Sequence, residues 1–177
     1  MTEAEFLEQN AGQVYNLALR LTGNRADAED VAQDALLRAV RALPGFRGDS
    51  RLSTWAYRIT VNTWKNRVRS EKRRKFWSTI SLGLISSQDG ETIQDVKADE
   101  PALDAGIESA ERSATVQKAL LELDENDRAI VVLREIEEKS YEEIGEMLDL
   151  GQGTIKSRLF RARAKLKTLL TATAART

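Results

Sequence analysis

Apolar residues recur at helical spacing along most of this chain of 177 residues, and strand-like alternation with hairpin signals is found nowhere in it. Between Ala28 and Leu43, apolar side chains occupy successive i, i+3 and i+4 positions almost without error, until Pro44-Gly45 ends the pattern. A helix of this kind buries one apolar face and leaves the other to water. We therefore predict an all-α fold.

Start and stop signals divide the pattern into helices. Thr2 and Glu5 have the spacing of a capping box, which predicts the start of the first helix. A Gly-Asn pair ends that helix, and Asn24 can cap the second. Ser53 is predicted to cap a third long helix that reaches about Lys75. The expected apolar face of the first helix consists of Phe6, Val14, Ala18 and Leu21.

Helical periodicity is lost from about Phe76 to Glu111, where Asp, Gly, Ser and Pro recur. A connector of this length is unusual inside one domain. We predict two small helical domains, residues 1–76 and 112–177, joined by a flexible acidic linker, residues 77–111. The apolar stretch FWSTISLGLIS, residues 76–86, is either a docking segment or one more turn of packed helix. Periodicity then resumes, with an expected apolar face of Val116, Ala119, Leu120 and Leu123.

Charge is distributed in blocks, although the net charge is only −1. Residues 44–75 hold ten basic side chains against two acids, residues 87–111 hold eight acids and one lysine, and residues 153–167 hold six basic side chains and no acid. Two basic surfaces separated by an acidic connector indicate a nucleic-acid partner more strongly than the overall charge would.

The composition excludes several classes of active site. The chain has no cysteine and no histidine, so disulfides, thiolate metal sites and the commonest general base are absent. The N-terminus is acidic and lacks the basic start of a signal peptide, and no run of about 18 apolar residues could span a membrane. We expect a soluble cytoplasmic protein without membrane insertion.

The C-terminal part has a helix-turn-helix pattern. Ser140 and Glu143 form a second capping box before the short helix YEEIGEML. The turn DLGQG follows, where Gly151 can take a left-handed conformation, and the second helix begins near Gly153. Gly145 lies where the two helices need to approach closely.

The second helix of this motif has three kinds of face. Its buried stripe is predicted to be Ile155, Leu159, Ala162 and Leu166, with basic residues on both flanks. The side opposite the stripe consists of Ser157, Phe160, Arg161, Ala164 and Thr168. An ordinary solvated basic face is the alternative interpretation. The lack of any acid and an exposed Phe160, which could touch a thymine methyl or a sugar, favour a helix in a DNA major groove.

Six of the ten aromatic residues lie between Phe46 and Trp77, interleaved with basic side chains. On the predicted third helix, Trp55 shares a face with Ile59, while Tyr57 and Trp64 share the opposite face. Either both faces are packed, or this region is a surface that stacks unpaired bases while its cations follow the backbone.

These segments together resemble one known family. FRGDSRLSTWAYRITVNTWKN, with DAEDVAQDALLRAVRAL before it and SYEEIGEMLDLGQGTIKSRLFRARAKL after it, is similar to the extracytoplasmic-function (group IV) RNA polymerase sigma factors. The match covers roughly residues 5–75 and 110–170. It implies a transcription initiation factor, not an enzyme, with no cofactor. The implied partners are the clamp and flap of core RNA polymerase, promoter DNA and an anti-sigma factor.

The resemblance also implies roles for particular residues. Sigma region 4 would read the −35 element as duplex DNA through Thr154, Lys156, Ser157, Arg158, Phe160, Arg161 and Arg163. Sigma region 2 would recognise and melt the −10 element through Phe46, Arg47, Gly48, Asp49, Ser50, Trp55, Asn62, Lys65, Asn66 and Arg69. The polymerase contact would be made by Asp27, Asp30, Gln33 and Asp34.

Two other hypotheses fit parts of the sequence. A helix-turn-helix regulator would also have a basic C-terminal helix, but it would bind duplex DNA alone, as a dimer, and would not need the basic, aromatic first domain. A carboxylate-based enzyme could use Asp27, Glu29, Asp30 and Asp34. Those acids lie on a polar helix face, with no second cluster evident to complete a metal site.

Overall fold

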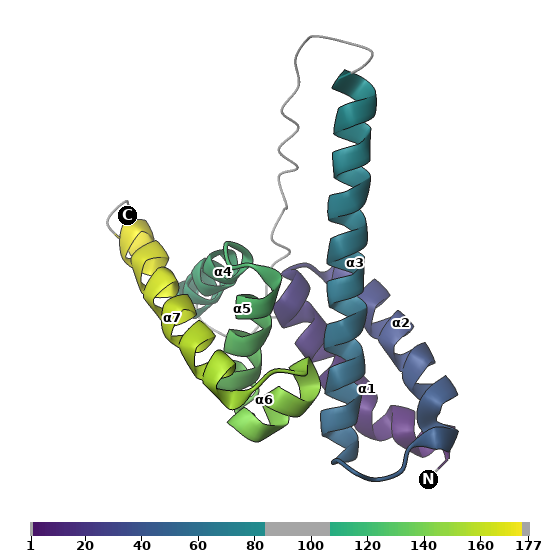
Figure 1. Ribbon diagram of the computed structural model, residues 1–177. Helices are drawn as coiled ribbons and strands as arrows, with labels where there is room; N and C mark the ends of the chain where they lie inside the picture. Colours follow the sequence, from purple (N-terminus) through teal and green to yellow (C-terminus); the bar gives the residue numbers. More distant parts are fainter. Residues whose placement is uncertain (1, 84–106, 175–177) are drawn as a thin grey trace.

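The computed structural model describes residues 2–83 and 107–174, and within these ranges every regular element is a helix (Figure 1). The all-α prediction is confirmed. Figure 1 shows the first three helices on one side of the molecule and the last four on the other. The elements are α1 (Glu3–Thr22), α2 (Arg25–Ala42), η1 (Leu43–Gly45), α3 (Leu52–Gly83), α4 (Ile107–Leu121), α5 (Glu125–Val131), η2 (Val132–Ile136), α6 (Tyr141–Leu148) and α7 (Gln152–Ala174).

Local capping signals place most of the helix starts. The side chain of Thr2 accepts a hydrogen bond from the backbone of Glu5, and Asn24 accepts one from the backbone of Asp27, as the sequence predicted. The prediction for Ser53 is wrong, because α3 already begins at Leu52 and Ser53 lies inside its first turn. A side-chain cap must stand before the first helical residue, where backbone N–H groups have no partner in the helix.

The third helix is longer than predicted. It contains 32 residues and continues through Gly83, past the expected end at Lys75. The start of the apolar stretch is therefore helical, yet Phe76 and Trp77 are 61% and 62% exposed and are not packed. Residues 84–106, which include the end of that stretch and most of the predicted linker, lie outside the described residues.

The first three helices pack small side chains of α2 against large side chains of α1 and α3. Helix α2 presents alanines to α1, and a row of small side chains allows two helix backbones to approach closely. Phe6, Leu17 and Leu21 of α1 are completely buried against them. Trp55 of α3 covers one edge of this core, with its ring 6.0 Å from that of Phe6.

The last four helices and η2 form the other half of the molecule. Leu120, Ile130, Leu133, Ile144, Met147, Ile155 and Leu159 fill its interior. Of the predicted apolar face, Ala119 and Leu120 in α4 and Leu123 just after it are buried, but Val116 is 43% exposed. The main contacts of helix α4 are with α7 and the end of α1, so the turns of α4 that face away from these two helices stay exposed.

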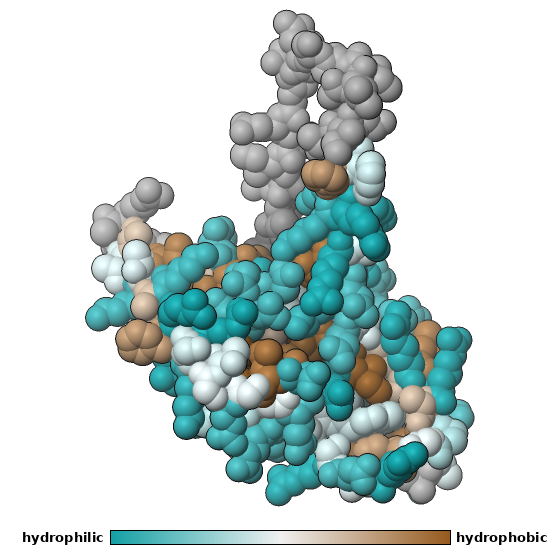
Figure 2. Space-filling model, viewed as in Figure 1, coloured by the Kyte–Doolittle hydropathy of each residue, from teal (hydrophilic) through white to brown (hydrophobic). Residues whose placement is uncertain are grey.

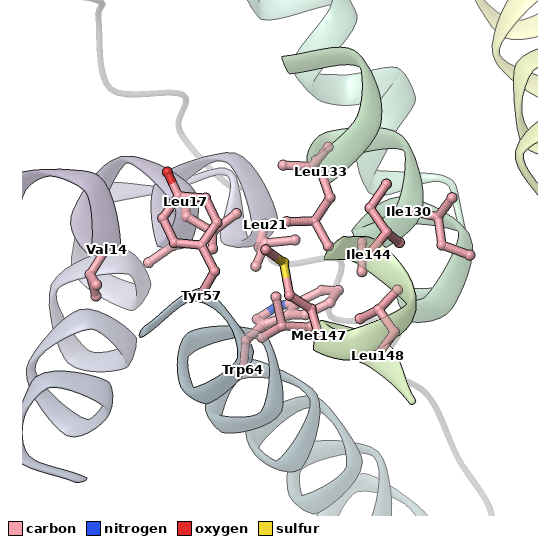
Figure 3. Packing of buried hydrophobic residues seen from close by; sticks show 14 of the residues in the cluster. Val14, Leu17, Leu21, Tyr57, Trp64, Ile130, Leu133, Ile144, Met147 and Leu148 are labelled. Carbon is pink, nitrogen blue, oxygen red and sulfur yellow. The ribbon is translucent and has the colours of Figure 1, made fainter. Parts of the chain in front are cut away.

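The two halves share one hydrophobic core, which the sequence did not predict. Trp64 of α3 is 2% exposed, and Figure 3 shows it facing α6, where Met147 lies. Arg128 of α5 donates a hydrogen bond of 2.9 Å to the carbonyl oxygen of Leu21, and its guanidinium carbon lies 5.5 Å from the Trp64 ring centroid. Gln117 donates to the carbonyl oxygen of Arg20. The second half therefore caps the C-terminus of α1.

None of the helices in residues 2–83 and 107–174 is long and apolar enough to cross a membrane.

Candidate nucleic-acid interface

The turn between α6 and α7 is built from local signals and one close contact. Ser140 and Glu143 exchange the two hydrogen bonds of a capping box, which sets the start of α6. Asp149, with φ 55°, takes the left-handed conformation at its end. The prediction that Gly151 does so is wrong, because a short polar side chain also tolerates that conformation. A Cβ on Gly145 would lie 2.9 Å from the carbonyl oxygen of Leu150, so the predicted close approach is confirmed and involves the turn itself.

Helix α7 buries the predicted stripe and exposes the predicted face. Ile155, Leu159 and Ala162 are buried, and Leu166 is half-buried. Ser157, Arg161, Ala164 and Thr168 are exposed, and Phe160 is exposed to 75% of its surface. Thr154, at the start of the helix, is exposed as well. On the face seen in Figure 2, hydrophilic side chains predominate, and apolar side chains reach the surface only in patches.

The basic flanks of α7 are held by groups of the same half of the molecule. Arg158 forms an ion pair of 3.1 Å with Asp127, and Arg163 forms one of 2.5 Å with Glu135. The ammonium of Lys156 lies 5.4 Å from the ring centroid of Tyr141. Sequence reasoning missed Asp127 and Glu135, which lie 31 and 28 residues before their partners. No helical spacing links residues so far apart, so the pattern held no signal for them.

The loop between η1 and α3 is an exposed bend anchored at one end. Gly48 has φ 78°, a conformation that favours glycine, and open space surrounds it. Arg47 and Asp49 are exposed beside it, while Phe46 and Ser50 are half-buried. The rings of Phe46 and Trp55 lie 5.0 Å apart, so Trp55 holds the loop to the helix rather than standing free.

Helix α3 buries two of its aromatic residues on the side opposite its exposed amide groups. Tyr57 and Trp64 are buried, and Trp55 on the opposite face is half-buried against the core, so the interpretation that both faces of this helix are packed is confirmed at these aromatic residues. Asn62, Asn66 and Arg69 are exposed, and their helical spacing places them on the same side of α3 as Trp55, opposite Tyr57 and Trp64. Lys65 beside them is half-buried, and burial, followed by the nearby charge of Arg69, lowers the pKa of its ammonium. This side of α3 can offer amide groups and cations together.

Three acidic residues of α2 form ion pairs. A single nitrogen of Arg67, Nη2, lies 3.0 Å from carboxylate oxygens of both Asp27 and Asp30, which ties α2 to α3. Asp34 pairs with Arg38 at 2.9 Å on the same helix, and Gln33 is exposed. The sequence did not identify Arg67 as their partner. Within residues 2–83 and 107–174, no group of three or more carboxylates is arranged to hold a metal ion.

Comparison with known proteins identifies both halves. Residues 6–74 match the family profile of Sigma-70 region 2, and residues 113–166 match that of Sigma-70, region 4. The RNA polymerase sigma-H factor of Pseudomonas aeruginosa is 37% identical over 85% of this chain and 77% of its own length. The ECF RNA polymerase sigma factor SigW of Bacillus subtilis is 33% identical over 93% of this chain and 86% of its own.

A solved structure has the same fold. The sigma factor RpoE of Bartonella quintana, crystallised with the anti-sigma factor NepR, aligns with a TM-score of 0.69 at 24% identity. The alignment covers 95% of this chain and 96% of that one.

Proposed function

Because the chain belongs to the extracytoplasmic-function family of RNA polymerase sigma factors, we propose that it reads a −35 element as duplex DNA and melts a −10 element. At the level of the family, it is a transcription initiation factor that associates with RNA polymerase and directs it to promoters. In the finer proposal, residues 1–76 act as sigma region 2, residues 77–111 as the linker and residues 112–177 as sigma region 4.

The exposed face of α7 is the observation that carries the proposal. It is the second helix of a helix-turn-helix, has no acid among residues 153–167, and presents Phe160 and Arg161 outward. Such a helix enters the major groove, with base-reading side chains at its front and phosphate partners on its flanks. Arg161 would read a base edge, with Thr154 and Ser157 beside it. Lys156, Arg158 and Arg163 would approach the phosphates.

Melting of the −10 element is assigned to the loop at residues 46–50 and to the polar side of α3. A factor that opens a duplex must hold an unpaired base at a cost of a few kcal/mol. The loop exposes Asp49 and backbone groups, and Asn62 offers both a donor and an acceptor to a base edge. Lys65, Asn66 and Arg69 would follow the strand. Trp55 would hold the loop in place through its contact with the Phe46 ring.

The remaining partners are proteins. The polar side of α2, with Asp30, Gln33 and Asp34 exposed and Asp27 half-buried, is proposed to contact the polymerase clamp, and region 4 to contact the flap. The structural relative in Bartonella is bound to an anti-sigma factor. An anti-sigma factor is therefore part of the proposal for this chain.

The two halves must separate on a promoter of this kind. Positions −35 and −10 are 25 base pairs apart, which at about 3.4 Å per pair is about 85 Å of duplex. A compact chain of this length has a radius of gyration of only about 16 Å. The shared core around Trp64 would therefore open when both elements are bound.

Reconstitution with core RNA polymerase tests the proposed function. The full chain should co-elute with the polymerase and give promoter-specific initiation, and promoters selected from a random library should share two conserved elements. Arg161→Ala should change the preferred base in the upstream element, and Asn62→Ala should change one in the downstream element. Tight binding of the chain alone to duplex DNA as a dimer, without any effect on the polymerase, would instead support the helix-turn-helix regulator.

A further inference from the structure

One line of exposed side chains runs along α3 beyond the residues assigned so far. Asn62, Asn66 and Arg69 are followed at the same helical spacing by Arg73, and then by Phe76 and Trp77. All six side chains are exposed. We call this set the α3 stripe. Its first three members are proposed above to hold the melted strand, and its last two lie beyond residue 74, where the match to Sigma-70 region 2 ends.

The two aromatic residues at the end of the stripe differ from the others in this region. Trp55, Tyr57 and Trp64 are packed in the core or at its edge, whereas Phe76 and Trp77 are 61% and 62% exposed. Their ring centroids lie 5.9 Å apart at 75°, an edge-to-face contact that leaves ring surface open to a ligand. Figure 1 shows this end of α3 projecting beyond the neighbouring helices. Packing within the described part of the chain does not account for the pair.

The charges near Phe76 and Trp77 favour a polyanionic ligand. Residues 72–75 are four basic side chains in succession, and no acid occurs between Lys72 and Trp77. A lipid surface is also anionic, but binding to it requires a continuous apolar helix face. On the N-terminal side of the pair, along the described part of α3, no such face exists, because the nearest preceding apolar side chain, Val68, packs on the core. Lys72 is paired with Glu125, and the exposed Arg73 and Arg74 precede the two rings in the same helix. Exposed rings next to such cations fit a ligand that alternates flat apolar faces with negative charge.

We propose that Phe76 and Trp77 stack on unpaired bases of the melted promoter strand, while Arg69 and Arg73 contact its phosphates. This inference rests on the proposed function and extends it. From Asn62 to Trp77 the helix rises about 22 Å at about 1.5 Å per residue, which provides a track for several nucleotides. Stacking of this kind tolerates any base, so the pair adds affinity for the open strand without adding sequence preference.

The test removes the π-faces and keeps the apolar volume. Holoenzyme assembled with the double variant Phe76→Leu, Trp77→Leu is titrated with a promoter that carries a pre-melted bubble and with the matching duplex. We expect bubble affinity to fall at least about fivefold, the lower end for loss of one stacked base, with little change on the closed duplex. The conservative variant Phe76→Tyr, Trp77→Phe should retain the affinity. Val116→Ala, which trims another exposed apolar side chain, should have no effect.

A second measurement uses the full chain alone. The emission of Trp77, isolated as the difference between the wild type and Trp77→Phe, should be quenched by oligothymidine and not by duplex DNA. Unchanged bubble affinity in the Leu variant, or a response of Trp77 only to phosphatidylglycerol vesicles, would overturn the inference. If either result occurs while wild-type holoenzyme initiates normally, only this inference fails and the proposed function is retained. If wild-type holoenzyme forms no promoter complex, the proposed function itself is contradicted.

Discussion

The hydroxyl of Tyr57 in α3 donates a hydrogen bond of 2.7 Å to Oε2 of Glu137, which follows η2 and is 80 residues away in sequence. The Tyr57 side chain is buried, and the ammonium of Lys139 lies 4.7 Å from its ring centroid. A charged acceptor strengthens such a bond. This contact fastens the region 2 half to the region 4 half beside their shared core.

Tyr57→Phe removes the hydroxyl and keeps the ring. We expect the free energy of unfolding to fall by about 1.5 kcal/mol, as for a hydrogen bond to a charged partner. The two halves should also separate more readily, measured as the distance between dyes on cysteines introduced in each half, since the chain has none of its own. Unchanged stability and unchanged distance would mean that the bond contributes nothing to the closed arrangement.

The same residue predicts a pH dependence. Burial, the hydrogen bond to Glu137 and the negative charge of that carboxylate all raise the pKa of Tyr57 above its ordinary value. The folded protein then holds the proton more strongly than the unfolded chain, so this contribution is complete below about pH 10 and is lost as the pH rises further. A difference titration of tyrosinate absorbance between wild type and Tyr57→Phe measures the shift. If the absorbance difference titrates at the ordinary pKa of tyrosine, burial and the bond to Glu137 do not raise the pKa of Tyr57.

Glu135 restrains a cation of α7. Both Nε and Nη2 of Arg163 donate to the same oxygen of Glu135. Glu135→Gln should release the guanidinium toward a phosphate, tighten duplex binding and steepen the salt dependence by about one unit of slope. Glu146→Gln, which removes the same charge from an exposed site on α6, is the matched control. If the two variants tighten duplex binding equally, the effect comes from the change in net charge and not from the release of Arg163.

Two glycines in helices should respond in opposite directions to alanine. Gly12 in α1 has open space around it, so Gly12→Ala should stabilise the protein by about 0.5–1 kcal/mol through helix propensity. At Gly145 the new Cβ would meet the Leu150 carbonyl at 2.9 Å, and the repulsion should destabilise by about 1–3 kcal/mol. Urea denaturation of both variants checks the sign. Stabilisation by both would show that the turn can shift away.

Asp34 tests the polymerase contact. Its ion pair with Arg38 is half exposed on both sides, so Asp34→Arg should change stability little. If the polar side of α2 meets the clamp, the reversed charge should weaken holoenzyme assembly severely. Glu29→Arg makes the same charge change on a neighbouring exposed position of α2 and serves as the control. Co-elution with core polymerase compares them, and assembly by Asp34→Arg at the wild-type level would remove Asp34 from the interface.

Local sequence patterns specify most helix starts, their caps and the faces of α7. Capping boxes at Thr2 and Ser140, and the burial of Ile155 and Leu159, depend on residues three or four positions apart, which local spacing specifies. The local errors of these patterns were small. The predicted start of α3, after a cap at Ser53, is two residues too late, because the helix begins at Leu52. Asp149 rather than Gly151 takes the left-handed conformation, because more than one residue of that turn tolerates it.

Which of these surfaces remain exposed depends on how the helices pack against one another. The sequence could not reveal that Trp64 lies in a core shared by both halves, or that Arg163 is held by Glu135. Nor could it tell that Phe76 and Trp77 are the exposed aromatic residues of α3, because helical periodicity assigns faces and does not say what covers them. Coverage depends on contacts between residues tens of positions apart, and those form only when whole helices pack against one another.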